Sequence, residues 1–171
     1  WVLKAAASRH DASFEVVDIS SYNLPLLDEP VPPSQGQYAN DHTKKWADDI
    51  ATFDGFIFVT PEYNHGTSGA LKNALDFVYG EWTNKAAAFV SYGSVGGTRA
   101  VEQLRPVMAE LQIADVRAQV ALPFSTDFDD TGRFTPTPRR DEELKVLLEQ
   151  LVGWADALRG LRTRQGWLAT S

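Results

Sequence analysis

The sequence predicts an α/β fold: a parallel sheet with helices covering both of its faces. Strand-like and helix-like segments alternate along the whole chain, which is the pattern of a sheet built from strand–helix–strand units. Polar or glycine-containing loops follow the strand-like segments, at the edge where such sheets hold ligands. The chain has 171 residues, of which 43% are apolar, so one domain with a substantial core is expected.

The expected elements follow from local pattern. Residues 1–7 resemble the second half of a helix, and residues 14–19 are β-branched and bounded by turn formers, which predicts a strand. Four prolines in residues 20–35 favour a surface loop. The remaining predicted elements are a helix over 36–53, a strand over 55–60, a helix after Ser68 as N-cap, a strand over 85–91, a helix after Thr98, a strand over 116–122 and a helix over 141–158.

These elements amount to four strands with a helical stub in front of them. A right-handed crossover starts from a strand, so the stub implies a strand that precedes it. We therefore expect a parent fold of five strands, and a sequence that omits an N-terminal segment.

Composition excludes several functions. The chain has no cysteine, so disulfides, thiolate ligands and a cysteine nucleophile are excluded. A net charge of −7 argues against nucleic-acid binding. No signal peptide and no apolar run of about 20 residues is present, which favours a cytoplasmic protein without membrane association. His10, His42 and His65 lack ligand spacing, so no metal is assigned.

The loop after the predicted strand 55–60 carries the most information about function. Pro61, Glu62, Tyr63, Asn64 and His65 combine a turn former, an aromatic face, an amide and backbone N–H groups near a helix start. That set suits a planar heteroaromatic ligand with polar edges. A tight connection in which Pro61 and Asn64 serve only the turn explains the same residues equally well.

A second loop follows the next predicted strand and contains Ser91, Tyr92, Gly93 and Ser94, with two further glycines behind them. Glycines let a backbone approach a ligand, but the loop matches neither the GxGxxG nor the GxxxxGK[ST] pattern. The second loop is informative about function because of its position. Both loops follow consecutive parallel strands, so they can form two sides of one crevice. A hydrolase is disfavoured, since there is no GxSxG elbow and Glu62 is the only carboxylate in this crevice.

Together these motifs resemble the NADPH-dependent FMN reductase family, the flavodoxin-like group that includes quinone, azo-dye and chromate reductases. The resemblance is carried by residues 61–64, 68–76, 91–94 and 96–97, and it extends from the stub to about residue 158. It implies a doubly wound sheet of order 2-1-3-4-5 lacking its first strand, a single FMN-binding domain over residues 1–160, and a tail over 161–171.

The resemblance also implies an activity. FMN would be held by Pro61, Glu62, Tyr63, Asn64 and His65 and bordered by Ser91, Tyr92, Gly93 and Ser94. Hydride from NAD(P)H would pass through flavin N5 to a quinone or similar small acceptor, with no catalytic side chain required. A homodimer or dimer of dimers is implied, with Trp82 as a candidate contact. The family's phosphate-binding loop has no counterpart after residue 1, so weak FMN binding by this stretch alone is expected. The alternative is a flavodoxin-like electron carrier or scaffold without turnover.

Overall fold

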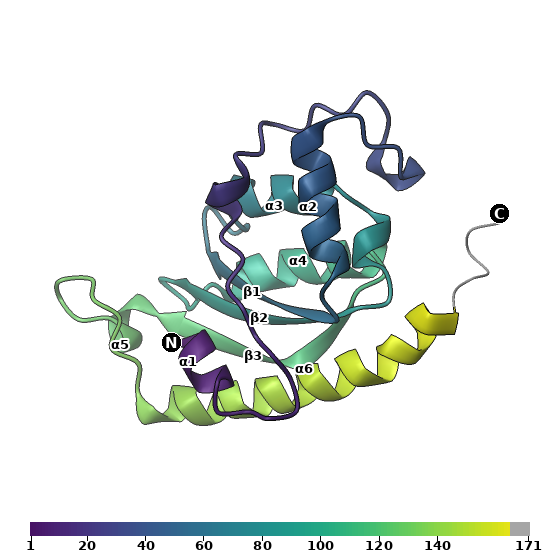
Figure 1. Ribbon diagram of the computed structural model, residues 1–171. Coiled ribbons are helices and arrows are strands. Elements are labelled where there is room, and N and C mark those ends of the chain that lie inside the picture. Colours follow the sequence, from purple (N-terminus) through teal and green to yellow (C-terminus); the bar gives the residue numbers. More distant parts are fainter. Residues whose placement is uncertain (165–171) are drawn as a thin grey trace.

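The computed structural model describes residues 1–164 and shows an open parallel sheet between two layers of helices (Figure 1). The sheet contains β1 (Gly55–Pro61), β2 (Ala86–Gly93) and β3 (Ala114–Pro123), in the order β1-β2-β3. One face is covered by α2 (Asp41–Ala51), α3 (Gly69–Asp76) and α4 (Thr98–Glu110), and the other by α1 (Val2–Ala6) and α6 (Pro138–Arg164). The short α5 (Phe124–Asp127) follows β3, and 3-10 turns cover Ile19–Tyr22, Pro33–Gln35 and Gly80–Trp82. The predicted α/β architecture with both faces covered is confirmed.

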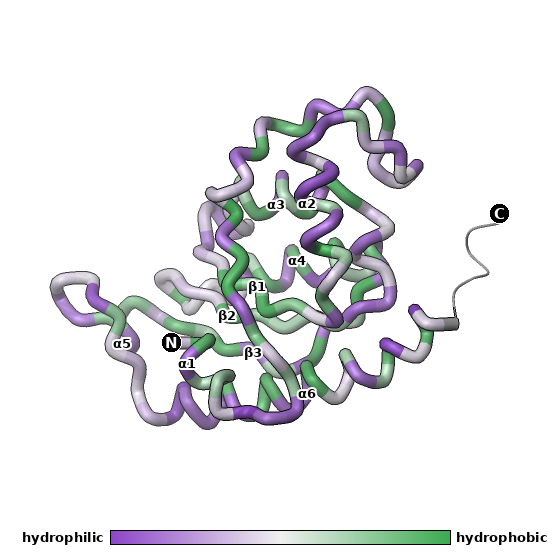
Figure 2. Tube along the Cα trace, viewed as in Figure 1, coloured by the Kyte–Doolittle hydropathy of each residue, from purple (hydrophilic) through white to green (hydrophobic). Residues whose placement is uncertain are grey.

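Two apolar clusters hold the layers together. Trp46, Leu75 and Phe89 belong to the cluster between the sheet and α2, α3 and α4. Val120 and Leu147 belong to the cluster between the sheet and α6. Figure 2 shows the strands as largely hydrophobic segments at the centre of the molecule. Burial on both faces explains why β2 is apolar almost throughout rather than alternating.

Local signals placed most helices correctly. The Ser68 hydroxyl accepts a hydrogen bond from the Leu71 N–H at 3.2 Å, which confirms it as the N-cap of α3. The helix expected over 36–53 is shorter, because Gly36 adopts a left-handed φ of 64° and the α-helix begins only at Asp41. Within residues 1–164, no helix is long and apolar enough to cross a membrane.

The prediction of a strand over residues 14–19 is wrong. This segment is extended, but the backbone groups of residues 12–17 form no hydrogen bond with any described residue. Phe14 packs against the apolar cluster on the α6 side, whereas Val17 and Ile19 pack against the cluster on the opposite face. The segment therefore crosses the edge of β1 instead of pairing with it. Its β-branched residues pack against apolar side chains without pairing to another strand, so residues 1–164 contain three strands where four were expected.

Two further expectations need correction. Trp82, expected as an exposed contact between subunits, is 1% exposed and donates its indole N–H to the Leu75 carbonyl oxygen at 3.1 Å, so it belongs to the core. The final helix does not end near residue 158 but continues to Arg164, beyond the expected start of a tail at 161. Residues 165–171 of that expected tail lie outside the described residues.

Candidate functional site

Both predicted loops lie at the carboxyl ends of β1 and β2. Pro61 stands opposite Tyr92 in the parallel register, and the Glu62 N–H donates to the Tyr92 carbonyl oxygen at 3.0 Å. This bond extends the ladder one residue past β1 and fixes the two loops against each other. The sequence-based expectation that they share one edge of the sheet is confirmed.

The first loop is a tight two-residue turn with an exposed tip. Tyr63 and Gly66 exchange backbone hydrogen bonds of 2.9 Å in both directions, and the two residues between them, Asn64 and His65, have φ values of 50° and 67°. Two successive left-handed residues define a turn of the type I′ class, a conformation that is uncommon for residues other than glycine and in which asparagine and histidine are enriched among them. The turn projects the side chains of Tyr63, Asn64 and His65 into solvent, with Tyr63 63% exposed.

Glu62 does not face the crevice freely, because its carboxylate is bound to Arg99. Its side chain is 4% exposed. It accepts hydrogen bonds from the Arg99 Nε at 2.6 Å and from the Arg99 backbone N–H, at the start of α4, at 3.1 Å. This hydrogen bonding and the charge of Arg99 hold the pKa of Glu62 below its usual value. Glu62 thus fastens the first loop to α4.

Arg99 is a residue that sequence reasoning missed. Besides binding Glu62, its Nη1 lies 2.8 Å from the His65 Nε2. A guanidinium only donates, so the His65 Nε2 accepts in this arrangement. Arg99 therefore supports both the base and the tip of the turn. The available signal was chemical: Glu62 is a lone carboxylate at the end of a buried strand, and such a group needs a cationic partner.

The second loop is closely packed at its base and open at its tip. The Ser91 hydroxyl is buried and donates to the Gly96 carbonyl oxygen at 2.7 Å, and Gly93 is also buried. At Gly97, whose φ is 73°, an added Cβ would lie 2.7 Å from the Ser91 Cβ, so a side chain there would collide with the strand. Tyr92 is half-buried and Ser94 is exposed. Burial, and secondarily the nearby Tyr63, raises the pKa of the Tyr92 hydroxyl.

The predicted site residues therefore divide into two groups. Glu62, Ser91 and Gly93 are engaged in internal packing and hydrogen bonds, and they hold the loops in place. Pro61 and Tyr92 are partly exposed. The exposed side chains are Tyr63, Asn64, His65 and Ser94. Aromatic faces beside amide, imidazole and hydroxyl groups suit the stacking surface and polar edge of a flat heteroaromatic ring.

Two donors of these loops that could bind a phosphate are already engaged. Among their described residues, the buried hydroxyl of Ser91 is taken by Gly96 and the guanidinium of Arg99 is taken by Glu62 and His65. The donor chemistry of the exposed side chains therefore suits the ring of a flavin mononucleotide better than the engaged Ser91 and Arg99 suit its phosphate.

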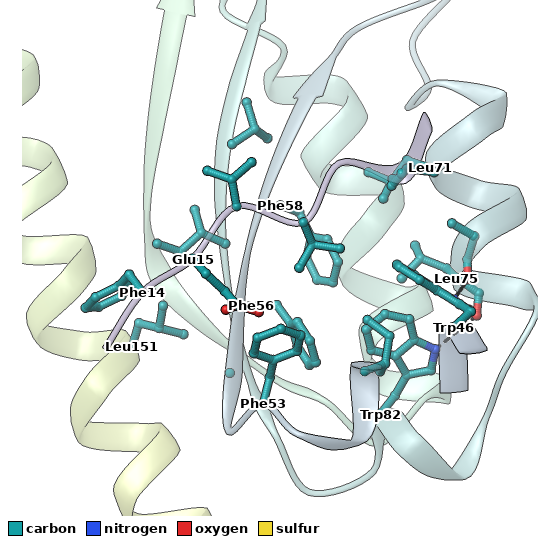
Figure 3. Close-up of a pocket in the computed structure, with 18 of the residues that line it drawn as sticks. Phe14, Glu15, Trp46, Phe53, Phe56, Phe58, Leu71, Leu75, Trp82 and Leu151 are labelled. Atoms are coloured by element: carbon teal, nitrogen blue, oxygen red, sulfur yellow. Dashed lines mark hydrogen bonds between the residues drawn. The ribbon is translucent and has the colours of Figure 1, made fainter. Parts of the chain in front are cut away.

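An apolar cavity of about 300 Å³ lies elsewhere, along the edge of β1 that does not pair with β2. We call it the edge slot. In Figure 3 its lining residues come from the extended segment containing Phe14 and Glu15, from β1, from the helical layer containing Trp46 and Leu71, and from Leu151 on α6. None of the sequence-predicted site residues lines it. The two loops that follow β1 and β2 are separate from this slot.

Comparison with known proteins gives the family context. A family model described as NADPH-dependent FMN reductase matches residues 1–127. The chain is 40% identical over 138 residues to the NAD(P)H-dependent FMN reductase ntnL of Nectria sp, a match that covers 75% of this chain and 68% of that protein. It is 28% identical over 151 residues to a quinone reductase of Pseudomonas putida, covering 83% of this chain and 77% of that protein.

Solved structures support the fold. The flavoenzyme NAD(P)H:(acceptor) oxidoreductase FerB from Paracoccus denitrificans superposes with a TM-score of 0.70 at 22% identity, covering 91% of this chain and 86% of that one. The chain spans 55% to 68% of the length of ntnL and of two further NAD(P)H-dependent FMN reductases that it matches.

Proposed function

Because the chain belongs to the NADPH-dependent FMN reductase family, we propose that it acts as an FMN-dependent NAD(P)H oxidoreductase that reduces quinones or similar small electrophiles. The main observation in support is the exposed type I′ turn at the carboxyl end of β1. Tyr63, Asn64 and His65 lie side by side in this turn, and Arg99 contacts His65. Quinone as the acceptor is supported by relatives named quinone reductase.

The residues have distinct parts in this proposal. Tyr63, Tyr92 and Pro61 offer flat surface to the ring, and Asn64, His65 and Ser94 offer polar groups to its edge. Glu62 and Arg99 keep the turn in position. FMN, when bound, would supply hydride acceptance and donation at its N5 atom. The protein's own contribution is to place the ring, to leave one face open to donor and acceptor in turn, and to require no proton transfer from a side chain.

Binding and turnover test the proposal directly. Purified protein is titrated with FMN and with lumiflavin, which carries the ring without the phosphate, and NAD(P)H consumption is followed with a quinone present. We expect the protein to quench the fluorescence of both FMN and lumiflavin. We also expect NAD(P)H oxidation that depends on both flavin and quinone. Absence of both quenching and turnover would remove the proposal. Quenching with only stoichiometric NAD(P)H oxidation would instead favour the electron carrier.

A double variant locates the ring. Tyr63→Ala with Asn64→Asp removes one stacking face and places a negative charge at the ring edge, so we expect lumiflavin affinity to fall about tenfold or more, given that each aromatic contact or edge bond is worth about 1 kcal/mol. The matched control is Leu26→Ala with Asp130→Asn, two exposed positions outside the loops. Equal lumiflavin affinity in the two variants would move the ring site elsewhere.

A further inference from the structure

Each strand of the sheet is followed by an exposed apolar side chain at its carboxyl end. Tyr63 comes two residues after β1, Val95 two residues after β2, and Phe124 directly after β3. Their exposed fractions are 63%, 48% and 50%. Single exposed apolar side chains are ordinary, whereas several at one edge of a sheet mark a contact surface. Phe124, which opens α5 (Figure 1), lies in neither of the two loops assigned to the flavin ring.

Tyr92 lies between Phe124 and the loop that follows β1. In the parallel register, Tyr92 pairs with Pro61 of β1 on one side and with Leu122 of β3 on the other. Its ring centroid lies 6.5 Å from that of Phe124, with 55° between the ring planes. Neighbouring strands are about 4.8 Å apart, so the start of α5 stands about 10 Å from the first loop across the sheet. A flavin ring held by that loop and Tyr92 leaves the ring of Phe124 free for a second ligand.

Phe124 is fixed in position although it is exposed. Asp127, at the end of α5, is fully buried, and its carboxylate accepts hydrogen bonds from the Arg140 Nε at 3.1 Å and from the Thr126 hydroxyl at 2.8 Å. The Phe128 ring meets the Phe124 ring edge-on, with their centroids 5.3 Å apart. Because these contacts already restrict α5, covering Phe124 with a ligand requires little further ordering.

The chemistry of α5 favours an uncharged ligand. Among its four residues the only ionisable side chain is Asp127, and Arg140 neutralises it inside the protein. Phe124 therefore offers aromatic surface without a charge that would bind a carboxylate or a phosphate. Val95 adds alkyl surface at the same edge of the sheet. This combination suits a fused aromatic ring that carries no charge.

We propose that Phe124 is a specificity-determining residue for the electron acceptor, and that it contacts the fused, non-reacting ring of a bicyclic quinone. This inference rests on the proposed function. A monocyclic quinone has no such ring and gains nothing from Phe124. The contact therefore raises the specificity for bicyclic over monocyclic quinones by the contribution of one aromatic pair.

Turnover with two quinones tests this selectivity. FMN-loaded protein oxidises NAD(P)H with 1,4-naphthoquinone or 1,4-benzoquinone, and each quinone takes up one hydride and one proton from solvent to become the hydroquinone. The measured quantity is the ratio of kcat/KM for naphthoquinone to kcat/KM for benzoquinone. Phe124→Ala should lower this ratio about fivefold, the loss expected for one aromatic contact, whereas Phe124→Trp keeps a flat ring and should hold the ratio within about twofold. The matched control is Trp154→Ala, at a 48% exposed aromatic position on α6, which should leave the ratio unchanged.

Binding without turnover gives an independent readout. Backbone amide NMR spectra of the FMN-loaded protein are recorded during a titration with 1,4-naphthoquinone in the absence of NAD(P)H. We expect the amide signals of residues 124–127 to shift, and we expect Phe124→Ala to weaken naphthoquinone binding about fivefold. FMN affinity, measured by flavin fluorescence, should be the same in Phe124→Ala and wild type. The chain has no cysteine, so its side chains include no thiol that would consume the quinones.

The outcomes separate this inference from the proposed function. If wild type oxidises NAD(P)H with neither quinone, the proposed function fails and the inference falls with it. If wild type reduces both quinones but Phe124→Ala keeps the ratio, or lowers both kcat/KM values equally, only the inference is overturned. A loss of FMN affinity in Phe124→Ala would also overturn it, because Phe124 would then belong to the flavin site.

Discussion

At the scale of single residues, the Glu62–Arg99 pair explains how an exposed turn is held in an unfavourable backbone conformation. A carboxylate that is 4% exposed at the end of a strand is costly to bury, and Arg99 offsets that cost with side-chain and backbone donors. The same guanidinium then reaches His65 at the tip. The pair therefore couples the start of α4 to the turn that presents the proposed ring contacts.

Removing the charge of Glu62 should destabilise the protein. For Glu62→Gln we expect a loss of about 1–3 kcal/mol in the free energy of unfolding at pH 7, because charge-assisted hydrogen bonds become weaker ones and the guanidinium of Arg99 loses its counter-charge. Unfolding by urea measures this change in the free energy of unfolding. The control is Glu102→Gln, since Glu102 is 73% exposed and its oxygen lies 3.9 Å from Arg105; its effect should stay within about 0.5 kcal/mol.

The Glu62–Arg99 pair also makes the stability of the protein fall in acid. Arg99 lowers the pKa of Glu62 below its ordinary value of 4.5, so the folded state favours the ionised form. This contribution is complete above about pH 4.5 and is lost as the pH falls through the lower, folded-state pKa. The difference between wild type and Glu62→Gln should therefore shrink in acid. A difference that stays constant down to pH 3 would contradict the assignment.

At the scale of elements, the type I′ turn stores strain that a simpler sequence would avoid. Asparagine followed by glycine is the common choice for such turns, yet this chain has His65 at the second left-handed position, with a φ of 67°. Strain of this kind concentrates at functional sites. We infer that His65 is present for its side chain rather than for the turn.

Replacing His65 distinguishes its effect on protein stability from its effect on flavin binding. His65→Gly should leave the free energy of unfolding unchanged or raise it by up to about 1 kcal/mol, since relief of the left-handed strain competes with the greater chain entropy of glycine. Lumiflavin affinity should fall. Gln112→Gly is the matched control, because Gln112 is exposed, has a φ of 56° and lies outside both loops. Equal lumiflavin affinity in His65→Gly and wild type would show that the histidine serves the turn alone.

Elements differ in how far the sequence could predict them. The central strands and α3 were predictable because apolar runs and the Ser68 cap act locally. Residues 14–19 were mispredicted, since β-propensity describes how a segment would fit a sheet and cannot supply the neighbouring strand. The shared edge of the two loops followed from topology. Arg99 was missed because its partner Glu62 lies 37 positions away and the contact exists only after β1 and β2 align.

At the scale of the whole molecule, Lys85 joins parts that are distant in sequence at the amino end of the sheet. It is 3% exposed, and its Nζ donates to the Ile50 and Ala51 carbonyl oxygens, at 2.6 and 3.1 Å, where α2 ends. Its backbone carbonyl oxygen accepts from the N–H of Ala114, the first residue of β3. On α6, Arg162 donates to the Asn84 carbonyl oxygen next to it. Lys85 thus caps a helix inside the core.

Burial of this ammonium makes stability depend on pH at the alkaline end. Burial, and secondarily the charge of Arg162, lowers the pKa of Lys85 from 10.5 to about 8. The unfolded chain then binds more protons than the folded one between those pH values, so the free energy of unfolding should rise with pH across this window by up to about 3 kcal/mol. Lys85→Met removes the titration and should flatten the rise relative to wild type. Lys145→Met, at an exposed position on α6, should preserve it. Guanidinium melts at pH 8, 9 and 10 measure the slopes, and parallel slopes in wild type and Lys85→Met would show that other groups carry the dependence.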